Sequence, residues 1–291
     1  MTMKKILVTS STGLTGRAVV KYLSKVGVCV RAMVHSDRHV QEILTVGAEE
    51  TVIASVDDAD DMRRAMNGVD TVFYICPTAH PREGEIGIMA IDLASELGVE
   101  RFVYQSVHNS IEPGLIHHRQ KLMVEQHLLE SALSYTILRP AAFMQNILSN
   151  AKQIREEHLF SQRFFINDSA SNRINLIDVD NYGEIAAKVT LGEDYDYAQL
   201  DLCGPQNLSV KDMLDALSEA VSSEINLHYI TDKDFISFAE SRKMPRHTLD
   251  VLLAMFRSYN RYGFLGNSYV ASKILGRPLN KFSSFAVNAL R

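Results

Sequence analysis

The stretch ILVTSSTGLTGRAVVKYL at residues 6–23 constrains the fold of this chain most strongly, because its residue pattern changes twice. Residues 4–9 are an apolar run of the kind found in buried strands. Residues 10–16 are small and include Gly13 and Gly16, and from Leu14 onward the apolar residues repeat with helical spacing until Gly27, a stop signal for a helix. The chain therefore begins with a strand, a tight turn and a helix.

The alternation of strand and helix patterns continues as far as Pro140. Further strands are expected at residues 28–34, 51–54, 70–76, 101–105 and 135–138, and helices at 38–46, 58–66, 83–97 and about 116–132. Strands that alternate with helices at this spacing form βαβ units, whose strands pair in parallel. The strand runs are apolar on both faces, which is typical of a sheet covered on both sides. We therefore predict a doubly wound α/β fold.

The pattern becomes mostly helical after Pro140. Helical segments are expected at residues 141–157, 178–191, 209–222, 232–242 and 245–262, and short strands near 173–177, 198–202 and 226–230. We predict that residues 1–140 form the doubly wound domain. Residues 141–291 are expected to form a smaller, mostly helical C-terminal cap whose segments partly interleave with the sheet.

Charge and cysteine content exclude several classes of protein. The net charge is −5 and no dense basic run is present, which argues against nucleic acid or an anionic membrane as a partner. Cys29, Cys76 and Cys203 are scattered, so neither a disulfide framework nor a zinc site is expected. The apolar run near the N-terminus is too short for a signal peptide and no stretch is long enough to span a membrane. We expect a cytoplasmic protein.

The loop after the first strand has the spacing of a dinucleotide-binding turn. In such a turn three positions are normally glycine, for a tight bend, for approach to the pyrophosphate and for close helix packing; here they are Ser10, Gly13 and Gly16. The start of the following helix offers free N–H groups to phosphate. We predict cofactor contacts along the whole loop, from Ser10, Thr12, Gly13, Leu14, Thr15 and Gly16. The alternative is a small-residue turn without a ligand, and we expect Ser10 to keep a negative φ.

Several motifs in order resemble the NmrA-like family of atypical short-chain dehydrogenases/reductases. They are SSTGLTG at 10–16, VCVRAMVHSDRH at 28–39, DDADDMRRAMNGVDTVFYICP at 57–77, VERFVYQSV at 99–107, KLMVEQHLLESALSYTILRPAAFMQN at 121–146, RINLIDVDNYGEIAA at 173–187 and ILGRPLNKFSSFA at 274–286. The resemblance covers nearly the whole chain. It implies a Rossmann-type sheet that binds NAD(P)(H).

The residues after the second strand bear on the choice between NADP and NAD. An acidic residue at this place selects NAD, and a basic one accommodates the 2′-phosphate of NADP. His35 falls where the family often has an arginine, and Arg38 is close by, so NADP(H) is expected and NAD(H) less so. The alternative is that both side chains are simply solvated. Ser55 replaces the aspartate that the family places on the adenine side.

The candidate catalytic residues lie at the start of the helix at 116–132. The wider superfamily pairs a tyrosine with a lysine four residues later, and here Lys121 is present but His117 stands in place of the tyrosine. Lys121 matches a lysine that the related isoflavone-reductase-like group uses in proton handling, or it binds the cofactor ribose. His117 is a candidate general acid near neutral pH. The alternative for His117 and His118 is a solvated helix start, which we favour.

Four further positions are expected beside the cofactor. Ser106 ends the fifth strand, at the carboxyl edge that faces a ligand crevice in such sheets. Cys76 and Pro77 follow the fourth strand and are expected to flank a ribose, with Cys76 as a small buried residue more readily than a reactive thiol. Phe143 resembles the family residue whose backbone meets the nicotinamide.

Three functions are compatible with these residues. The first is an NADPH-dependent reductase of a small quinone, dye or enone, for which proximity does most of the work. The second is a non-catalytic redox sensor that reports the cofactor ratio to a partner protein, which the missing tyrosine favours. The third, a sugar-nucleotide epimerase, needs the acid–base tyrosine and ranks last.

Overall fold

The computed structural model describes residues 3–162 and 172–290, which form two compact units. The first unit contains the residues up to Ile111, together with His117–Pro140 and Val179–Asp201. The second contains Glu112–Ile116, Ala141–Asp178 and the residues from Leu202 onward. The chain thus leaves the first unit after Pro140 and returns to it for one helix and one strand.

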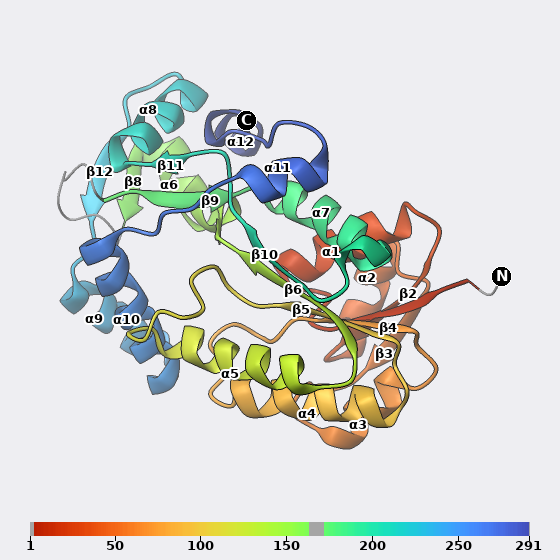
Figure 1. Ribbon diagram of the computed structural model, residues 1–291. Helices are drawn as coiled ribbons and strands as arrows, with labels where there is room; N and C mark the ends of the chain where they lie inside the picture. The colour runs from red at the N-terminus through yellow and green to blue at the C-terminus, as the bar shows by residue number, and fades with distance from the viewer. Residues whose placement is uncertain (1–2, 163–171, 291) are drawn as a thin grey trace. The chain divides into compact units, whose positions relative to one another are not determined.

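A seven-stranded sheet forms the centre of the first unit (Figure 1). Its order is β10-β6-β5-β4-β1-β2-β3. The strands are β1 (Lys5–Val8), β2 (Cys29–Val34), β3 (Glu50–Ile53), β4 (Thr71–Tyr74), β5 (Arg101–Gln105), β6 (Ser134–Pro140) and β10 (Ala198–Leu202). From β3 to β6 all neighbouring strands pair in parallel. The strand order reverses between β1 and β4. From β1 successive strands are added on one side of it (β2, β3), and from β4 onward they are added on the other side (β5, β6).

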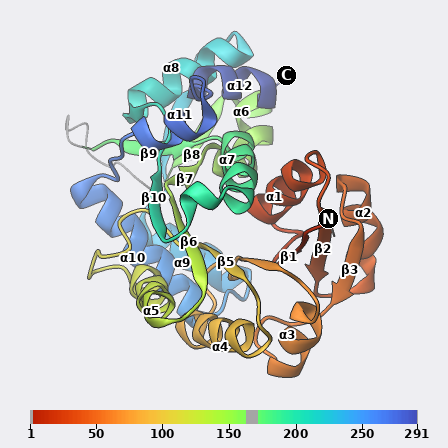
Figure 2. The same cartoon turned by 45° about the vertical axis from the view of Figure 1, so that its right-hand side comes forward.

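Helices cover both faces of this sheet (Figure 2). On one face lie α1 (Leu14–Ser24), α2 (Val40–Val46) and α7 (Val179–Leu191), and on the other lie α3 (Ala59–Met66), α4 (Glu83–Glu96) and α5 (Ile116–Glu130). Short 3₁₀ helices occur at η1 (Asp37–His39) and η3 (Glu193–Tyr195). Helix α7 packs closely on α1 because Gly183 faces Ala18, where a Cβ would come within 2.8 Å. The predicted doubly wound α/β fold is confirmed.

The same close packing joins α4 to α5. A Cβ added at Gly87 would lie 2.5 Å from Val124, and one at Gly84 would lie 2.6 Å from the side-chain oxygen of Gln120. The Gly84 N–H donates to that oxygen over 2.8 Å. Two glycines on one helix face therefore bring the first turn of α4 against the first turns of α5.

The second unit contains short strands and the remaining helices. They are β7 (Ala142–Phe143), η2 (Met144–Asn150), α6 (Ala151–Glu157), β8 (Leu159–Gln162), β9 (Ile174–Ile177), β11 (Asn207–Leu208), α8 (Val210–Val221), β12 (Asn226–Tyr229), α9 (Asp232–Ser241), α10 (Arg246–Tyr262), α11 (Tyr269–Leu275) and α12 (Phe282–Leu290). Strand β9 lies between β11 and β7, and β12 pairs with β8. The expected helix at 141–157 is partly wrong, because it begins as a strand and a 3₁₀ helix and becomes α-helical only at Ala151.

A buried asparagine holds the small sheet of the second unit together. The Asn175 side chain accepts from the Gly204 N–H over 2.6 Å and donates to the oxygen of Asn207 over 3.0 Å. Asn207 in turn accepts from the Gly266 N–H. Because buried amide groups cost free energy when they are left unpaired, this network fixes the connections around β9 and β11.

Candidate active site

The loop after β1 lies where the strand order of the sheet reverses. Ligands of doubly wound sheets bind at this reversal, outside the carboxyl ends of the strands. Here β1 and β4 are adjacent, and their ends are joined by side-chain hydrogen bonds. The Thr9 hydroxyl donates to the Ile75 carbonyl over 2.9 Å and accepts from the Ile75 N–H over 2.7 Å. The position of the loop is therefore fixed to the end of β4.

Ser10 adopts the left-handed backbone conformation, with φ +45°. The expectation of a negative φ is wrong: the turn demands the backbone that glycine usually supplies, and the serine adopts it. A left-handed residue with a side chain costs about 1–2 kcal/mol. The Ser10 hydroxyl donates to the Ile75 carbonyl over 2.9 Å, which offsets part of that cost. The first position of the loop thus keeps the geometry of the glycine turn.

The two glycines of the loop have different structural roles. A Cβ at Gly16 would lie 2.3 Å from the Ser10 carbonyl oxygen and 2.8 Å from the Ser11 Cα, so this glycine is required for the helix to pass the turn. A Cβ at Gly13 would meet only the Ser10 oxygen, at 3.3 Å. A Cβ at Gly13 therefore meets a looser contact than one at Gly16, although 3.3 Å from a backbone oxygen is still close.

The N-terminus of α1 is open at this loop. Gly13 is the residue before the helix, and it provides no side-chain cap for the first-turn N–H groups. Gly13 and Leu14 are exposed, Thr12 is half-buried, and Thr15 and Gly16 are buried. The first turn contains no acidic residue. Uncapped N–H groups at a helix start, with their partial positive charge, suit a phosphate group.

Basic side chains cluster at the end of β2. Arg38 Nε donates to His39 Nε2 over 2.9 Å, and an Arg38 terminal nitrogen lies 3.4 Å from His35 Nε2. Arg17, in the first turn of α1, forms an ion pair with Glu42, which also lies 3.3 Å from His39. The predicted residues His35 and Arg38 are thus brought together. Arg17 and His39 were missed, although Arg17 directly follows the loop.

Ser55 lies after β3 and carries a carboxylate neighbour. Its hydroxyl donates to Asp57 over 2.5 Å, and its N–H donates to Asp61 over 2.8 Å. The hydrogen bond from Ser55 holds the pKa of Asp57 below its usual range. Ser55 is therefore hydrogen-bonded to two carboxylates that follow it in the chain, and its predicted contact with the cofactor stays a prediction.

Lys121 is bound to a buried glutamate. Its Nζ lies 2.7 Å from Glu83 Oε1 and 3.4 Å from the Gln105 carbonyl at the end of β5. The Lys121 side chain is 13% exposed and that of Glu83 is 2% exposed. Burial lowers the pKa of Lys121, but the charge and hydrogen bond of Glu83 more than offset this effect, and the net direction is upward. Lys121 is thus a fixed cation at the carboxyl edge of the sheet.

The two histidines before Lys121 are not solvated, so the favoured prediction of a solvated helix start is wrong. His118 is fully buried, and its Nδ1 donates to the Asn109 carbonyl over 2.7 Å. His117 is half-buried and packs edge-on against His118. Burial, with smaller effects of His118 and Lys121, lowers the pKa of His117 to about 3. At neutral pH His117 is therefore uncharged and has no imidazolium proton to give as a general acid.

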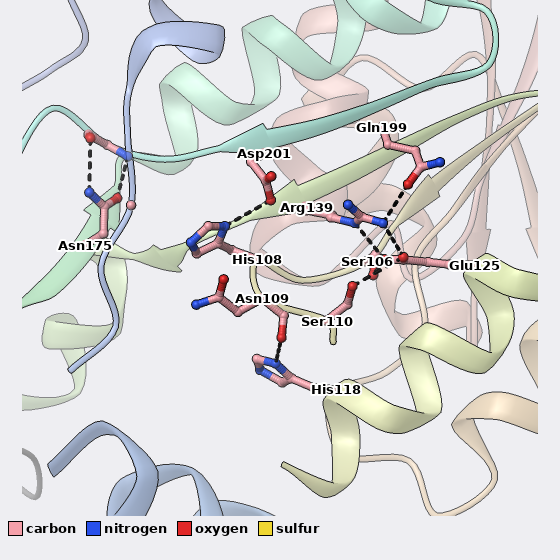
Figure 3. Close-up of polar contacts among 12 residues, drawn as sticks. Ser106, His108, Asn109, Ser110, His118, Glu125, Arg139, Asn175, Gln199 and Asp201 are labelled. Atoms are coloured by element: carbon pink, nitrogen blue, oxygen red, sulfur yellow. Dashed lines mark hydrogen bonds and ion pairs between the residues drawn. The ribbon is translucent and has the colours of Figure 1, made fainter. Parts of the chain in front are cut away.

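Ser106 is part of a buried network centred on Glu125 (Figure 3). The hydroxyls of Ser106 and Ser110 both donate to Glu125, and Arg139 forms a two-pronged pair with it at 3.0 and 2.6 Å. Arg139 also donates to Gln199 over 2.7 Å. This network fastens the loop after β5 to α5 and β6. The Ser106 hydroxyl therefore donates to Glu125, and the cofactor contact predicted for Ser106 stays a prediction.

A histidine–aspartate pair joins the loop after β5 to β10 (Figure 3). His108 Nδ1 donates to Asp201 over 2.9 Å, and the His108 N–H donates to the Pro140 carbonyl over 2.9 Å. The hydrogen bond from His108 lowers the pKa of Asp201. No spacing in the sequence indicates this pair, because Asp201 belongs to β10 and His108 to the loop after β5.

Of the remaining predicted positions, Cys76 and Pro77 belong to the first unit and Phe143 to the second. Cys76 is buried beside Glu83 and Lys121, and burial raises the pKa of its thiol far above the usual value, so it is an inert packing residue. Pro77 is exposed directly after it. Phe143 belongs to the second unit, where it is half-buried in β7 and pairs with Ile177.

Neither a metal-ion cluster nor a membrane-spanning helix occurs among the described residues. Within residues 3–162 and 172–290, no three His, Cys, Asp or Glu side chains are grouped to hold a metal ion. No helix in the same ranges has the length and apolar character needed to cross a membrane.

Comparison with protein families identifies the class of this chain. The model of the NmrA-like family matches residues 2–283, so the chain belongs to that family. NAD(P)H azoreductase of Xenophilus azovorans is 24% identical over 282 residues, which cover 97% of this chain and 96% of the relative.

Solved structures confirm the fold. The NADPH-dependent quinone oxidoreductase QOR2 of Escherichia coli, in complex with NADPH, superposes with a TM-score of 0.84 at 20% identity, over 98% of this chain and all of that one. The negative transcriptional regulator NmrA, in complex with NAD, gives a TM-score of 0.76 at 16% identity, over 99% of this chain and 95% of that one. One fold thus occurs both in a reductase and in a regulator.

Proposed function

We propose that this protein is an NADPH-dependent reductase of small, flat electrophiles such as quinones, azo dyes or enones. The observation that carries the proposal is the loop at the reversal of the strand order, with its glycine-type turn and the open start of α1. The named activities of the azoreductase and of the quinone oxidoreductase give the acceptor class.

The residues of the first unit fit a dinucleotide. The N–H groups of Gly13 to Gly16 would hold the pyrophosphate, and Arg38 with His35 would face the 2′-phosphate. Lys121 of α5, whose Nζ lies 3.4 Å from the Gln105 carbonyl at the end of β5, would donate hydrogen bonds to the ribose beside the nicotinamide. When bound, the dinucleotide supplies the hydride.

The side chains would act mainly by placing the reactants. Lys121 is held against Glu83 at 2.7 Å, so it keeps its proton and orients the cofactor. His117 is neutral at neutral pH, so it has no imidazolium proton to donate. After hydride addition, the oxyanion of a quinone, the enolate of an enone or the nitrogen anion of an azo dye would take its proton from water, because conjugation stabilises each anion. Proximity then provides most of the rate.

The second candidate is a sensor that binds the dinucleotide without turnover. It is favoured by the absence of a tyrosine at position 117, four residues before Lys121, and by the fold shared with the regulator NmrA. Secondary alcohols need an acid–base partner for the alkoxide, so neither candidate oxidises them.

The test measures loss of NADPH absorbance with a benzoquinone, an azo dye and a conjugated enone. We expect turnover with at least one of these acceptors and none with simple secondary alcohols plus NADP. Lys121→Ala is expected to weaken NADPH binding by about 10-fold to 100-fold and to change the rate at saturating cofactor much less. A rate loss of about 100-fold at saturation would instead show that Lys121 transfers a proton.

The control is NADPH binding measured by calorimetry. If NADPH binds while a broad set of acceptors gives no oxidation, the reductase is rejected in favour of the sensor. If NADPH does not bind, both candidates are rejected.

A further inference from the structure

The proposed reaction depends on a charged Lys121, so the surroundings of its buried partner, Glu83, bear on how that charge is kept. Glu83 is the first residue of α4, and its side chain is almost completely buried. Burial of a carboxylate costs several kcal/mol unless it is paired. Its position at a helix N-terminus and the Lys121 ammonium 2.7 Å away provide that compensation.

The packing of α4 on α5 sets the distance between these two side chains. Gly84 and Gly87 remove the side chains that would otherwise hold the helices apart. The hydrogen bond from the Gly84 N–H to Gln120 then fixes the register of the first turns. Glu83 precedes Gly84 and Lys121 follows Gln120, so the same contact places the carboxylate directly against the ammonium.

Lys121 is the more exposed member of the pair. The ammonium lies 3.4 Å from the Gln105 carbonyl, at the carboxyl end of β5, and the Lys121 side chain is 13% exposed. The Glu83 side chain is 2% exposed. The ring centre of Tyr104 lies 5.7 Å from Nζ. An ammonium has three N–H groups, and the Glu83 carboxylate and the Gln105 carbonyl are acceptors for two of them.

We propose that Glu83 is a positioning residue that holds the Lys121 ammonium in place as a permanent hydrogen-bond donor to the cofactor. This inference rests on the proposed function for the identity of the cofactor. Glu83 itself touches neither cofactor nor acceptor in this scheme and acts only through Lys121.

The charge balance around Lys121 supports this assignment. Burial alone lowers the pKa of a lysine. Glu83 makes the largest favourable contribution, Glu125 adds a smaller one, and the net pKa lies above the usual 10.5. The Cys76 thiol stays neutral because burial raises its pKa. Tyr74, Tyr104 and His118 are buried and His117 is half-buried, and all four are uncharged at neutral pH. Without Glu83, burial would dominate and Lys121 would lose its proton at a lower pH.

The first experiment uses the protein without cofactor. The lysine Cε signals are followed by NMR as the pH is raised, with Lys121 assigned by its loss in Lys121→Met. We expect Lys121 to stay protonated beyond pH 10.5 in the wild type and to titrate at a clearly lower pH in Glu83→Gln. An unchanged titration of Lys121 in Glu83→Gln would overturn the proposal, whatever the protein's activity.

The second experiment measures NADPH affinity by calorimetry as a function of pH. We expect the NADPH affinity of the wild type to include the contribution of Lys121 at every pH at which this lysine is protonated. Glu83→Gln is expected to bind about 10-fold more weakly near neutral pH, with a loss that grows as the pH rises. In the Lys121→Met background the same Glu83→Gln change is expected to have no further effect, because Glu83 acts only through the lysine.

Two variants control for structure. Glu85→Gln removes a carboxylate one residue beyond Gly84 that is 69% exposed and paired with Arg82, and it is expected to bind as the wild type does. Glu83→Asp keeps the charge but retracts it, so it is expected to weaken binding without the added pH dependence. If Glu83→Gln fails to fold, Glu83→Asp decides: wild-type affinity in that variant would overturn the proposal. Failure of the wild type to bind NADPH would reject the proposed function and leave the NMR result standing.

Discussion

At the scale of single residues, Ser10 shows how a loop keeps its geometry after losing a glycine. Its φ of +45° is the conformation that the turn requires, and its hydroxyl bonds to the Ile75 carbonyl over 2.9 Å. A backbone cost of about 1–2 kcal/mol is thus set against a hydrogen bond worth about 1 kcal/mol. The glycine-poor sequence of this loop therefore does not by itself argue against a phosphate site.

The basic cluster after β2 leads to a prediction on cofactor choice. We expect NADPH to bind more tightly than NADH by about 1–3 kcal/mol, because Arg38 and His35 would make charge-assisted contacts to the 2′-phosphate. Arg38→Ala is expected to remove most of this difference and to leave the affinity for NADH unchanged. The exposed Arg63, which pairs with Glu96, gives the matched control Arg63→Ala. Equal calorimetric affinities of the wild type for both cofactors would contradict the prediction.

At the scale of elements, the start of α1 combines one structural glycine with one that packing does not require. Gly16 faces the Ser10 carbonyl so closely that a Cβ would come within 2.3 Å of backbone. Gly13 has φ −72°, which any residue adopts, and a Cβ there has a single contact at 3.3 Å. Substitutions at the two positions therefore differ in their expected cost to the stability of the fold.

We predict opposite outcomes for substitutions at these two positions. Gly16→Ala is expected to destabilise the protein by about 1–3 kcal/mol, since backbone must move to admit the methyl group. Gly13→Val is expected to fold with much less loss, and to abolish dinucleotide binding because its side chain blocks the approach of the phosphate. Denaturant titration measures the first effect and calorimetry with NADPH the second. A folded Gly13→Val protein with unchanged NADPH affinity would remove the case for a dinucleotide at this loop.

At the scale of the whole molecule, the sequence predicted the parts of the fold that depend on periodicity. The strand and helix alternation up to Pro140 was sufficient for the doubly wound sheet, because burial of both sheet faces leaves a local pattern. A short strand near residues 198–202 was also predicted, but its place beside β6 depends on long-range pairing, which leaves no local pattern.

The site was less predictable from the sequence than the fold. In the sequence, Glu83 has the pattern of an acidic residue in a first helical turn, which is usually exposed. In the structure it is buried where α4 packs closely on α5 at Gly84 and Gly87. A solvated helix start was predicted for His117 and His118, but in the structure the Asn109 carbonyl of the loop after β5 accepts a hydrogen bond from the buried His118. Burial of polar residues is decided by tertiary contacts, which composition and spacing do not record.

These buried histidines predict how the stability of the protein depends on pH. Burial lowers the pKa of His118 to about 4, from an ordinary value of 6.5. The unfolded chain therefore binds a proton below pH 6.5 that the folded chain refuses, so the stabilising contribution is present above this pH and is lost as the pH falls toward 4. A difference of this size corresponds to an upper bound of about 3 kcal/mol. Denaturant titrations at pH 7 and pH 4.5 are expected to show a smaller acid-induced loss of stability in His118→Gln than in the wild type. The half-buried His127, paired with Asp92, gives the matched control His127→Gln, which is expected to keep the wild-type pH dependence. If His118→Gln loses as much stability on acidification as the wild type, His118 is not the group that takes up the proton.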